Sequence, residues 1–281
     1  MERIPACERR RSKFDHRVGA EDARPPSTLE LLVPRLSAII ITKDEARNIG
    51  ACLDALAFCD ERIVVDGGST DDTCAIARDK GAQVVVHAWE GFGAQKNFAL
   101  SLASGDWVLS VDADERVSPD LAAAVLAAIE RDDADGYEFP RLSSFCGRPM
   151  RHSGWWPDYV LRLFRRRCGH FTDVLVHERV ICEGRLARLS PPLIHHPVLK
   201  LEDALSRMDR YSTASAEAIV RSGRRISFMT GIGHGLGSFL RAYVLRAGFL
   251  DGAEGFLLAV ANAEGSYYRY MKAWLAERQH D

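Results

Sequence analysis

The strongest constraint on the fold is a regular alternation of short apolar runs and helical runs between residues 36 and 131. The apolar runs are "LSAIII", "RIVVD", "AQVVVHA" and "DWVLSVD", which have the length and the Val and Ile content of buried strands. Segments with helical spacing follow them, such as "NIGACLDALAF", "STDDTCAIARDKG" and "SPDLAAAVLAAIE". Strands that alternate with helices across short links predict an α/β fold with a mostly parallel, buried sheet.

This alternation stops after Gly136. The segments "GYEFPRLSSFCG" and "DYVLRLFRRR" are typical of strands with polar interruptions. From about Leu201 the spacing becomes helical again, beginning with "EDALSRMDRYSTASAEAIV". We therefore expect a helical C-terminal extension after the α/β part.

Polar side chains gather where three of the predicted strands end. The first strand ends at Thr42–Glu45, the second at Asp66–Ser69 and the fourth at Asp112–Asp114. In open α/β sheets, ligands bind beyond the carboxyl ends of the strands. The three polar ends therefore predict one binding site at a common edge of the sheet.

The segment "SVDADE" places Asp112, Asp114 and Glu115 directly after an apolar strand. Carboxylates this close repel each other and resist burial, so a positive charge should offset them. Residues two apart in an extended segment face the same way, and hard divalent cations prefer oxygen ligands. A solvated turn at a helix start is the alternative, but the two other acidic strand ends favour a site for Mg²⁺ or Mn²⁺.

The net charge of -2 hides a gradient along the chain. Residues 36–140 contain 20 acidic and 8 basic side chains, whereas residues 141–281 contain 13 acidic and 21 basic ones. An acidic half joined to a basic half suggests that one part holds a cation and the other meets an anionic partner.

Four motifs together resemble the successive motifs of family-2 glycosyltransferases of GT-A fold. They are "AIIITKDEARNI", "IVVDGGSTDDT", "AQKNFAL" and "GDWVLSVDADE", in this order over roughly residues 36–140. The resemblance implies a Rossmann-like sheet flanked by helices, a nucleotide-sugar donor that is most often UDP-linked, and a divalent metal. It also implies roles for six residues: Thr42 and Glu45 against the nucleoside, Asp66 at the uracil, Lys96 near base or ribose, Asp112 near ribose and metal, and Asp114 as metal ligand.

The second half resembles one branch of that family, the lipopolysaccharide inner-core glucosyltransferases. The matching segments are "FTDVLVHERV" after the basic "RLFRRR", then "LIHH", "LSRMDRYSTASA" and the closing "GFLDGAEGFLLAVANAEGSYYRYMK". The branch implies transfer of a hexose, with glucose as the first candidate, to a lipid-linked glycan.

Inverting transfer needs a base that takes the proton of the acceptor hydroxyl. Glu178 is our first candidate for this base and Asp173 the second. His195 has the family position of a further metal ligand, with His177 as the alternative, and His196 has no expected role.

Two basic segments each leave two interpretations open. The arginines of "RLFRRR", which include Arg162, belong either to a solvated strand edge or to a site for acceptor phosphates. Residues 226–250 are apolar but interrupted by His234, Arg241 and Arg246, so no uncharged run among them is long enough to span a bilayer. They form either an interfacial helix with peripheral membrane contact or an amphipathic helix packed on the domain.

The expected domain organisation has three parts. Residues 1–35 are polar and Arg-rich, lack a secretory signal and are expected to be a disordered tail. Residues 36–200 form the GT-A domain, with donor binding in 36–140 and the acceptor part in 141–200, and residues 201–281 form the helical region. Seven cysteines without metal-like spacing predict free thiols in a reducing compartment, hence a cytoplasmic protein or one peripheral on the inner face of the cytoplasmic membrane.

Three other functions compete with this prediction, and no nucleic-acid partner is expected. Transfer to a polyprenyl phosphate is the nearest alternative, but the long hydrophobic C-terminal spans common in that branch are missing. A phosphatase with a D-x-D-x-T motif is excluded, because Arg116 stands where the Thr would be. A non-catalytic module that binds nucleotide sugars stays open, although Asp114 and Glu178 argue against it.

Overall fold

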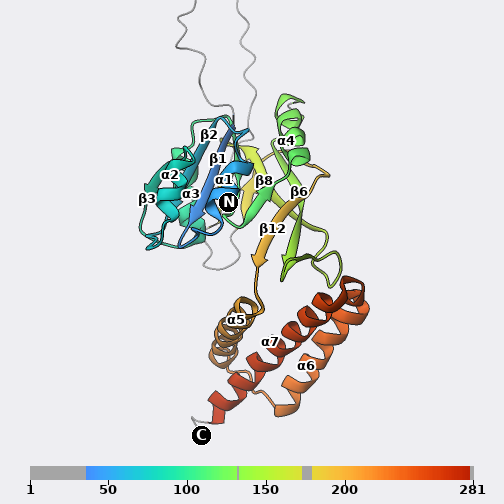
Figure 1. Ribbon diagram of the computed structural model, residues 1–281. Helices are drawn as coiled ribbons and strands as arrows, with labels where there is room; N and C mark the ends of the chain where they lie inside the picture. Colours follow the sequence, from blue (N-terminus) through green and yellow to red (C-terminus); the bar gives the residue numbers. More distant parts are fainter. Residues whose placement is uncertain (1–35, 132, 173–178, 279–281) are drawn as a thin grey trace, which may run out of the picture. The chain divides into compact units, whose positions relative to one another are not determined.

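The N-terminal part folds into the predicted alternation of strands and helices (Figure 1). The structure, a computed structural model, describes residues 36–131, 133–172 and 179–278. Its first elements are β1 (Leu36–Thr42), α1 (Ile49–Ala55), β2 (Glu61–Asp66), α2 (Thr73–Asp79), β3 (Gln83–Val86), α3 (Phe92–Leu102), β4 (Trp107–Ser110), β5 (Glu115–Val117) and α4 (Pro119–Arg131). The α/β fold class is confirmed.

One ten-stranded sheet contains most of the strands, in the order β3-β2-β1-β4-β8-β6-β12-β5. The strands β3, β2, β1 and β4 are parallel to one another, so their carboxyl ends share one edge. The later strands are β6 (Gly136–Phe145), β7 (Arg148–Pro149), β8 (Asp158–Arg165), β9 (Gly169–Phe171), β10 (Val180–Cys182), β11 (Leu186–Arg188) and β12 (Leu193–Val198). Of these, β7 and β11 pair with β6, and β9 pairs with β10 in a separate sheet.

The central strand β1 explains why this part of the sheet is buried on both faces. All seven of its residues are buried, and successive side chains point to opposite faces. Ala38 and Ile40 pack in a core cluster with residues of α1, α2 and α4, while Ile39 and Ile41 pack in a second cluster with α3. Helices therefore cover both faces, as a parallel sheet requires.

The C-terminal extension is helical, as predicted. It consists of α5 (Leu201–Arg221), α6 (Phe228–Leu240), a π-helical turn (Arg241–Leu245), a 3₁₀ turn (Gly248–Asp251) and α7 (Gly252–Arg278). The buried Asp251 joins this region to the loop after β7, because its carboxylate accepts hydrogen bonds from the backbone N–H groups of Arg151 and His152. Of the helices in the described ranges, none is long and apolar enough to cross a bilayer.

The structure corrects one interpretation of "RLFRRR". The strand β8 that carries Arg162 lies between β4 and β6, so it is not a solvated edge. Arg162 itself is 7% exposed and points into the acidic strand end described below, and contact of these arginines with acceptor phosphates stays a prediction. The sequence pattern had suggested an edge because its basic residues interrupt the apolar ones.

Candidate functional site

A short strand that the sequence did not predict builds the centre of the site. After β4, the chain turns through Asp112 and Asp114 into β5, which pairs antiparallel with β12. In this register His195 of β12 lies opposite Glu115 on one side and Ser143 of β6 on the other. The pairing brings the acidic segment against a histidine about 80 positions away in the sequence.

Protein cations offset two of the three carboxylates. Arg162 Nη2 lies 2.5 Å from Asp112 Oδ2 and 2.7 Å from Glu115 Oε1, so one guanidinium bridges both. Lys96 Nζ lies 2.9 Å from Asp112 Oδ1, and Arg141 Nη1 lies 3.6 Å from Glu115 Oε1. We expected a metal to supply all the positive charge here, but for Asp112 and Glu115 the chain supplies it.

The ion pairs also set the charge of Asp112. Burial raises the pKa of Asp112, but the Arg162 guanidinium and the Lys96 ammonium outweigh it and hold the pKa well below its usual range. The same pairs hold the pKa of Arg162 above its usual range, although burial opposes this. Asp112 and Arg162 therefore both stay ionised at neutral pH.

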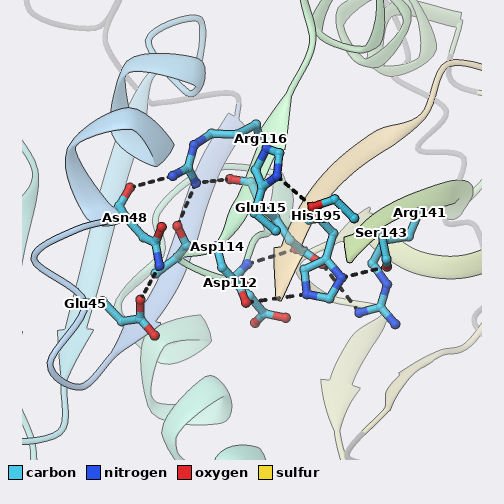
Figure 2. Close-up of polar contacts among 12 residues, drawn as sticks. Glu45, Asn48, Asp112, Asp114, Glu115, Arg116, Arg141, Ser143 and His195 are labelled. Carbon is cyan, nitrogen blue, oxygen red and sulfur yellow. Dashed lines mark hydrogen bonds and ion pairs between the residues drawn. The ribbon is translucent and has the colours of Figure 1, made fainter. Parts of the chain in front are cut away.

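Asp114 is the carboxylate of the three that faces a histidine. His195 Nε2 lies 3.5 Å from Asp114 Oδ2, and His195 Nδ1 lies 2.8 Å from the Ser143 hydroxyl (Figure 2). Burial raises the pKa of Asp114, but the contact with His195 outweighs it and lowers the pKa. The backbone N–H of His196 donates to the Asp114 carbonyl at 2.9 Å, which fixes the segment against β12.

The pair Asp114 and His195 fits a divalent cation that binds together with a substrate. Mg²⁺ and Mn²⁺ sites often use one or two protein ligands and complete their shell with phosphate oxygens and water. Within the described residues, no group of three or more His, Cys, Asp or Glu side chains could hold a metal by itself. The donor set therefore suits a cation that arrives with a diphosphate, and it does not suit a permanent structural ion.

Ser143 should orient His195 rather than touch a cation. Its hydroxyl contacts the ring nitrogen on the side away from Asp114, which is the position of an outer partner that fixes a ligand's ring. We expect Ser143→Ala to weaken Mn²⁺ affinity about 10- to 100-fold in the presence of UDP. Calorimetric titration with Mn²⁺ measures this change, and Ser144→Ala, next along β6, serves as the control. Unchanged Mn²⁺ affinity in Ser143→Ala would contradict this role.

A cavity of about 1310 Å³ opens beside this pair. It exceeds the range of about 300–1,000 Å³ that is usual for single small-molecule sites, so it has room for two substrates. All but one of the predicted donor-binding and metal residues in the described part line it: Thr42, Glu45, Lys96, Asp112, Asp114 and His195.

Among the described residues, Asp66 is the predicted donor-binding residue that does not line the cavity. It is 1% exposed, and its carboxylate accepts hydrogen bonds from the Thr42 hydroxyl, the backbone N–H groups of Gly68 and Ser69, and the Ser69 hydroxyl. It lies outside the described lining of the cavity and shapes the loop after β2. A contact between Asp66 and a nucleobase would need this loop to rearrange, and that contact stays a prediction.

Comparison with known proteins decides the family. The family model described as "Glycosyl transferase family 2" matches residues 37–183, which is more than half of the chain. This chain belongs to glycosyl transferase family 2. The predicted family is therefore confirmed. The acidic strand end lies within the matched residues, whereas His195 and the α5 residues of the cavity follow them in the sequence.

Relatives of this glycosyltransferase include one that is named for lipopolysaccharide core biosynthesis. The lipopolysaccharide core biosynthesis glycosyltransferase LpsC of Rhizobium meliloti is 31% identical over 266 residues, covering 89% of this chain and 95% of the relative. An uncharacterised glycosyltransferase of Rickettsia conorii is 29% identical over 256 residues, covering 86% and 90%. Among solved structures, S. aureus TarS 1–349 in complex with UDP is similar, with 19% identity, a TM-score of 0.45 and coverage of 88% and 92%.

The candidate bases of the glycosyltransferase, Glu178 and Asp173, lie outside the described residues, as does His177. Their roles stay predictions. The described chain resumes at Arg179, and Arg179 and Val180 line the cavity.

Sequence reasoning missed several residues of the glycosyltransferase that line the cavity. Arg207, Arg210 and Tyr211 of α5 do so, although the sequence placed α5 in a separate helical region. The positive charge of Arg207 also acts on Asp114 and lowers its pKa, as a smaller contribution beside that of His195. The basic and aromatic residues in "SRMDRYSTAS" were the available signal, but helical spacing alone did not show which face meets the site.

Proposed function

We propose that this family-2 glycosyltransferase moves a hexose, with glucose as the first candidate, from a UDP-sugar to a hydroxyl of a lipopolysaccharide core or related surface glycan, with inversion at the anomeric carbon. The observation that carries the proposal is the Asp114–His195 pair beside the large cavity of a family-2 chain. The similarity to LpsC across nearly the whole chain supports the choice of acceptor.

The donor would occupy the acidic end of the cavity. Thr42 and Glu45 would contact the nucleoside, and Lys96 with Asp112 would lie near the ribose. Lys96 and Asp112 are already joined at 2.9 Å, so they offer a fixed polar surface that does not have to be ordered when the donor binds. Residues 36–140 would thus form the donor part and residues 141–200 the acceptor part.

Asp114 and His195 would hold Mg²⁺ or Mn²⁺ together with the donor diphosphate. When bound, such a cation stabilises negative charge on the leaving diphosphate, a contribution of several kcal/mol. Arg207 and Arg210 of α5 also line the cavity and would add positive charge there. Arginine suits phosphate oxygens because its planar fork donates two parallel hydrogen bonds.

Glu178 would take the proton of the acceptor hydroxyl as its oxygen attacks the anomeric carbon, with Asp173 as the second candidate. Direct displacement in one step inverts the anomeric centre and needs no covalent intermediate. A lipid-linked acceptor would place this reaction at a membrane surface, on the side where UDP-sugars are made.

The change Glu178→Gln tests the base. It should lower kcat at least about 10²-fold, because general-base catalysis typically contributes that much. KM for the UDP-sugar should stay unchanged, since the base acts on the acceptor. Steady-state transfer assays with Glu178→Gln and the control Glu183→Gln measure both. If Asp173→Asn lost transfer activity while Glu178→Gln stayed fully active, Asp173 would be the base instead.

The donor itself is identified by a binding screen. Thermal-shift measurements use UDP-glucose, UDP-galactose and UDP-N-acetylglucosamine, each with Mn²⁺ or Mg²⁺. The enzyme's own donor should raise the melting temperature most, because a ligand that binds the folded state stabilises it by mass action. Transfer to a lipopolysaccharide-core acceptor with that donor separates an enzyme from a module that only binds. Binding without transfer to such acceptors would refute the proposed acceptor class.

A further inference from the structure

A second cavity lies between α6 and α7, two C-terminal helices that pack side by side (Figure 1). Its volume is about 410 Å³, and it has no lining residue in common with the donor cavity. Apart from two glycines, every described lining residue is polar or basic: His234, Ser238 and Arg241 on the α6 side, and Ser266 and Arg269 on α7. No Asp or Glu is among these described lining residues, so the composition suits an anion.

Arg269 has a hydrogen-bond donor at this cavity that the described residues leave unsatisfied. Its Nε is buried and finds no hydrogen-bond acceptor among the described residues. A buried donor without an acceptor is destabilising, and few remain in native proteins unless a ligand or an ion supplies the acceptor. The Tyr270 ring packs against both the Arg269 guanidinium, at 4.9 Å, and the His234 ring, at 4.3 Å. Two basic groups of the cavity are thus held in place before any ligand binds.

The cavity is bordered by apolar side chains that face solvent. Met229, Leu236 and Leu240 are exposed, and their spacing puts them on the same face of α6 as Gly233, which lines the cavity. Leu236 is 62% exposed, and Leu245 in the following turn is 79% exposed. An anion in this cavity therefore lies next to an uncovered apolar surface.

The other face of α6 is already used by α7. A Cβ atom added at Gly231 would lie 2.4 Å from Met271 Cε, and one added at Gly235 would lie 3.2 Å from Tyr267 Cβ. The missing side chains let the two helices approach closely, so α7 cannot also cover Met229, Leu236 and Leu240. Something outside the described chain must cover them, or they stay in water.

Two candidates could cover this apolar surface, a membrane and a second copy of the chain, and the charge around it favours the membrane. Residues 221–250 contain five arginines and no Asp or Glu. Two copies meeting through the same patch would bring these arginines together, because a two-fold interface presents the same surface from both sides. An anionic lipid surface instead offers phosphates to the arginines and hydrocarbon to the leucines.

We propose that the cavity between α6 and α7 binds the phosphate headgroup of an anionic membrane lipid, with Arg241 and Arg269 on the phosphate and Met229, Leu236 and Leu240 against the acyl chains. The site is separate from the sugar-transfer site and does not depend on which sugar or acceptor the enzyme uses. Its role is to hold the chain at a lipid surface.

Flotation of the full chain with lipid vesicles tests the proposal. The vesicles are phosphatidylcholine alone, or phosphatidylcholine with one part in five of phosphatidic acid. The wild type should bind the phosphatidic acid vesicles at least about tenfold more tightly, since two arginines near the surface each contribute about fivefold. Arg269→Gln and Arg241→Gln should each lose about fivefold, and Leu236→Ser should also weaken binding. The control Arg78→Gln, an exposed arginine on α2, should bind within about twofold of wild type, because it lies outside the site.

Three results would overturn the proposal. Equal vesicle binding by Arg241→Gln, Arg269→Gln and the control would exclude the cavity. Binding of inorganic phosphate without any preference for phosphatidic acid vesicles would show a site for soluble phosphate. Self-association that Leu236→Ser abolishes, without vesicle binding, would assign the surface to a second copy. Arg241 is exposed, so its variant should fold even if Arg269→Gln does not, and retained UDP binding at the donor cavity reports the fold of each variant.

Discussion

Replacing Arg162 by Met should lower the free energy of unfolding by about 3–5 kcal/mol, since removing one member of a buried ion-pair cluster leaves uncompensated negative charge in the interior. Arg162 is buried and bridges two carboxylates, at 2.5 Å to Asp112 and 2.7 Å to Glu115. Glu115 is fully buried, and within the described residues Arg141, at 3.6 Å, is its other cationic neighbour. Met keeps most of the side-chain volume, so the lost charge dominates the effect.

Urea denaturation followed by circular dichroism measures this loss. Arg188→Met on β11 is the matched control, because Arg188 also pairs with a carboxylate, Glu138 at 3.0 Å, but is 63% exposed. Exposed pairs contribute about 0–1 kcal/mol, so the control should stay within that range. Equal losses in both variants would show that Arg162 does not neutralise the acidic strand end.

Replacing Asp114 by Asn should lower kcat/KM for sugar transfer about 10³-fold, which corresponds to about 4 kcal/mol of transition-state stabilisation. Asn keeps the size of the side chain but removes the charge that a cation needs beside His195. The free energy of unfolding should change little, because Asp114 is paired only with His195, at 3.5 Å, among the described residues. The effect therefore falls on the chemistry and not on the fold.

Steady-state transfer assays across a series of Mn²⁺ concentrations measure the effect of Asp114→Asn. The control is Asp72→Asn, an exposed carboxylate after β2 that lies outside the described lining of the cavity. It should keep wild-type activity at every Mn²⁺ concentration. Full activity of Asp114→Asn would show that this carboxylate has no role in sugar transfer.

The sequence predicted the first half of the fold well because local patterns determine it. The run "LSAIIIT" is buried along its whole length, and such β-branched runs form central strands wherever helices can cover both faces. The strand β5 was missed because three residues carry no periodic signal, and its pairing with β12 depends on contacts distant in sequence. Tertiary pairing, rather than propensity, forms that strand.

The candidate site, too, could be predicted from the sequence only where local patterns determine it. The composition of "SVDADE" predicted a need for positive charge, and Lys96 and Arg162 meet that need for Asp112. Which cation meets which carboxylate could not be predicted, because Arg162 comes from a strand about 50 positions later. The placement of His195 beside Asp114 came from the family resemblance and not from spacing. For α5, the basic and aromatic residues were a signal, but helical spacing did not show which face of the helix lines the cavity.

The most direct test of the account is calorimetric titration of the wild type and of Asp114→Asn with the UDP-sugar donor, once with Mn²⁺ and once with EDTA. The account predicts that the wild type binds the donor at least about tenfold more tightly with Mn²⁺, as expected where a cation joins protein and diphosphate. In Asp114→Asn this difference should disappear. Equal donor affinity of the wild type in Mn²⁺ and in EDTA would contradict the central claim that Asp114 and His195 hold a cation on the departing diphosphate.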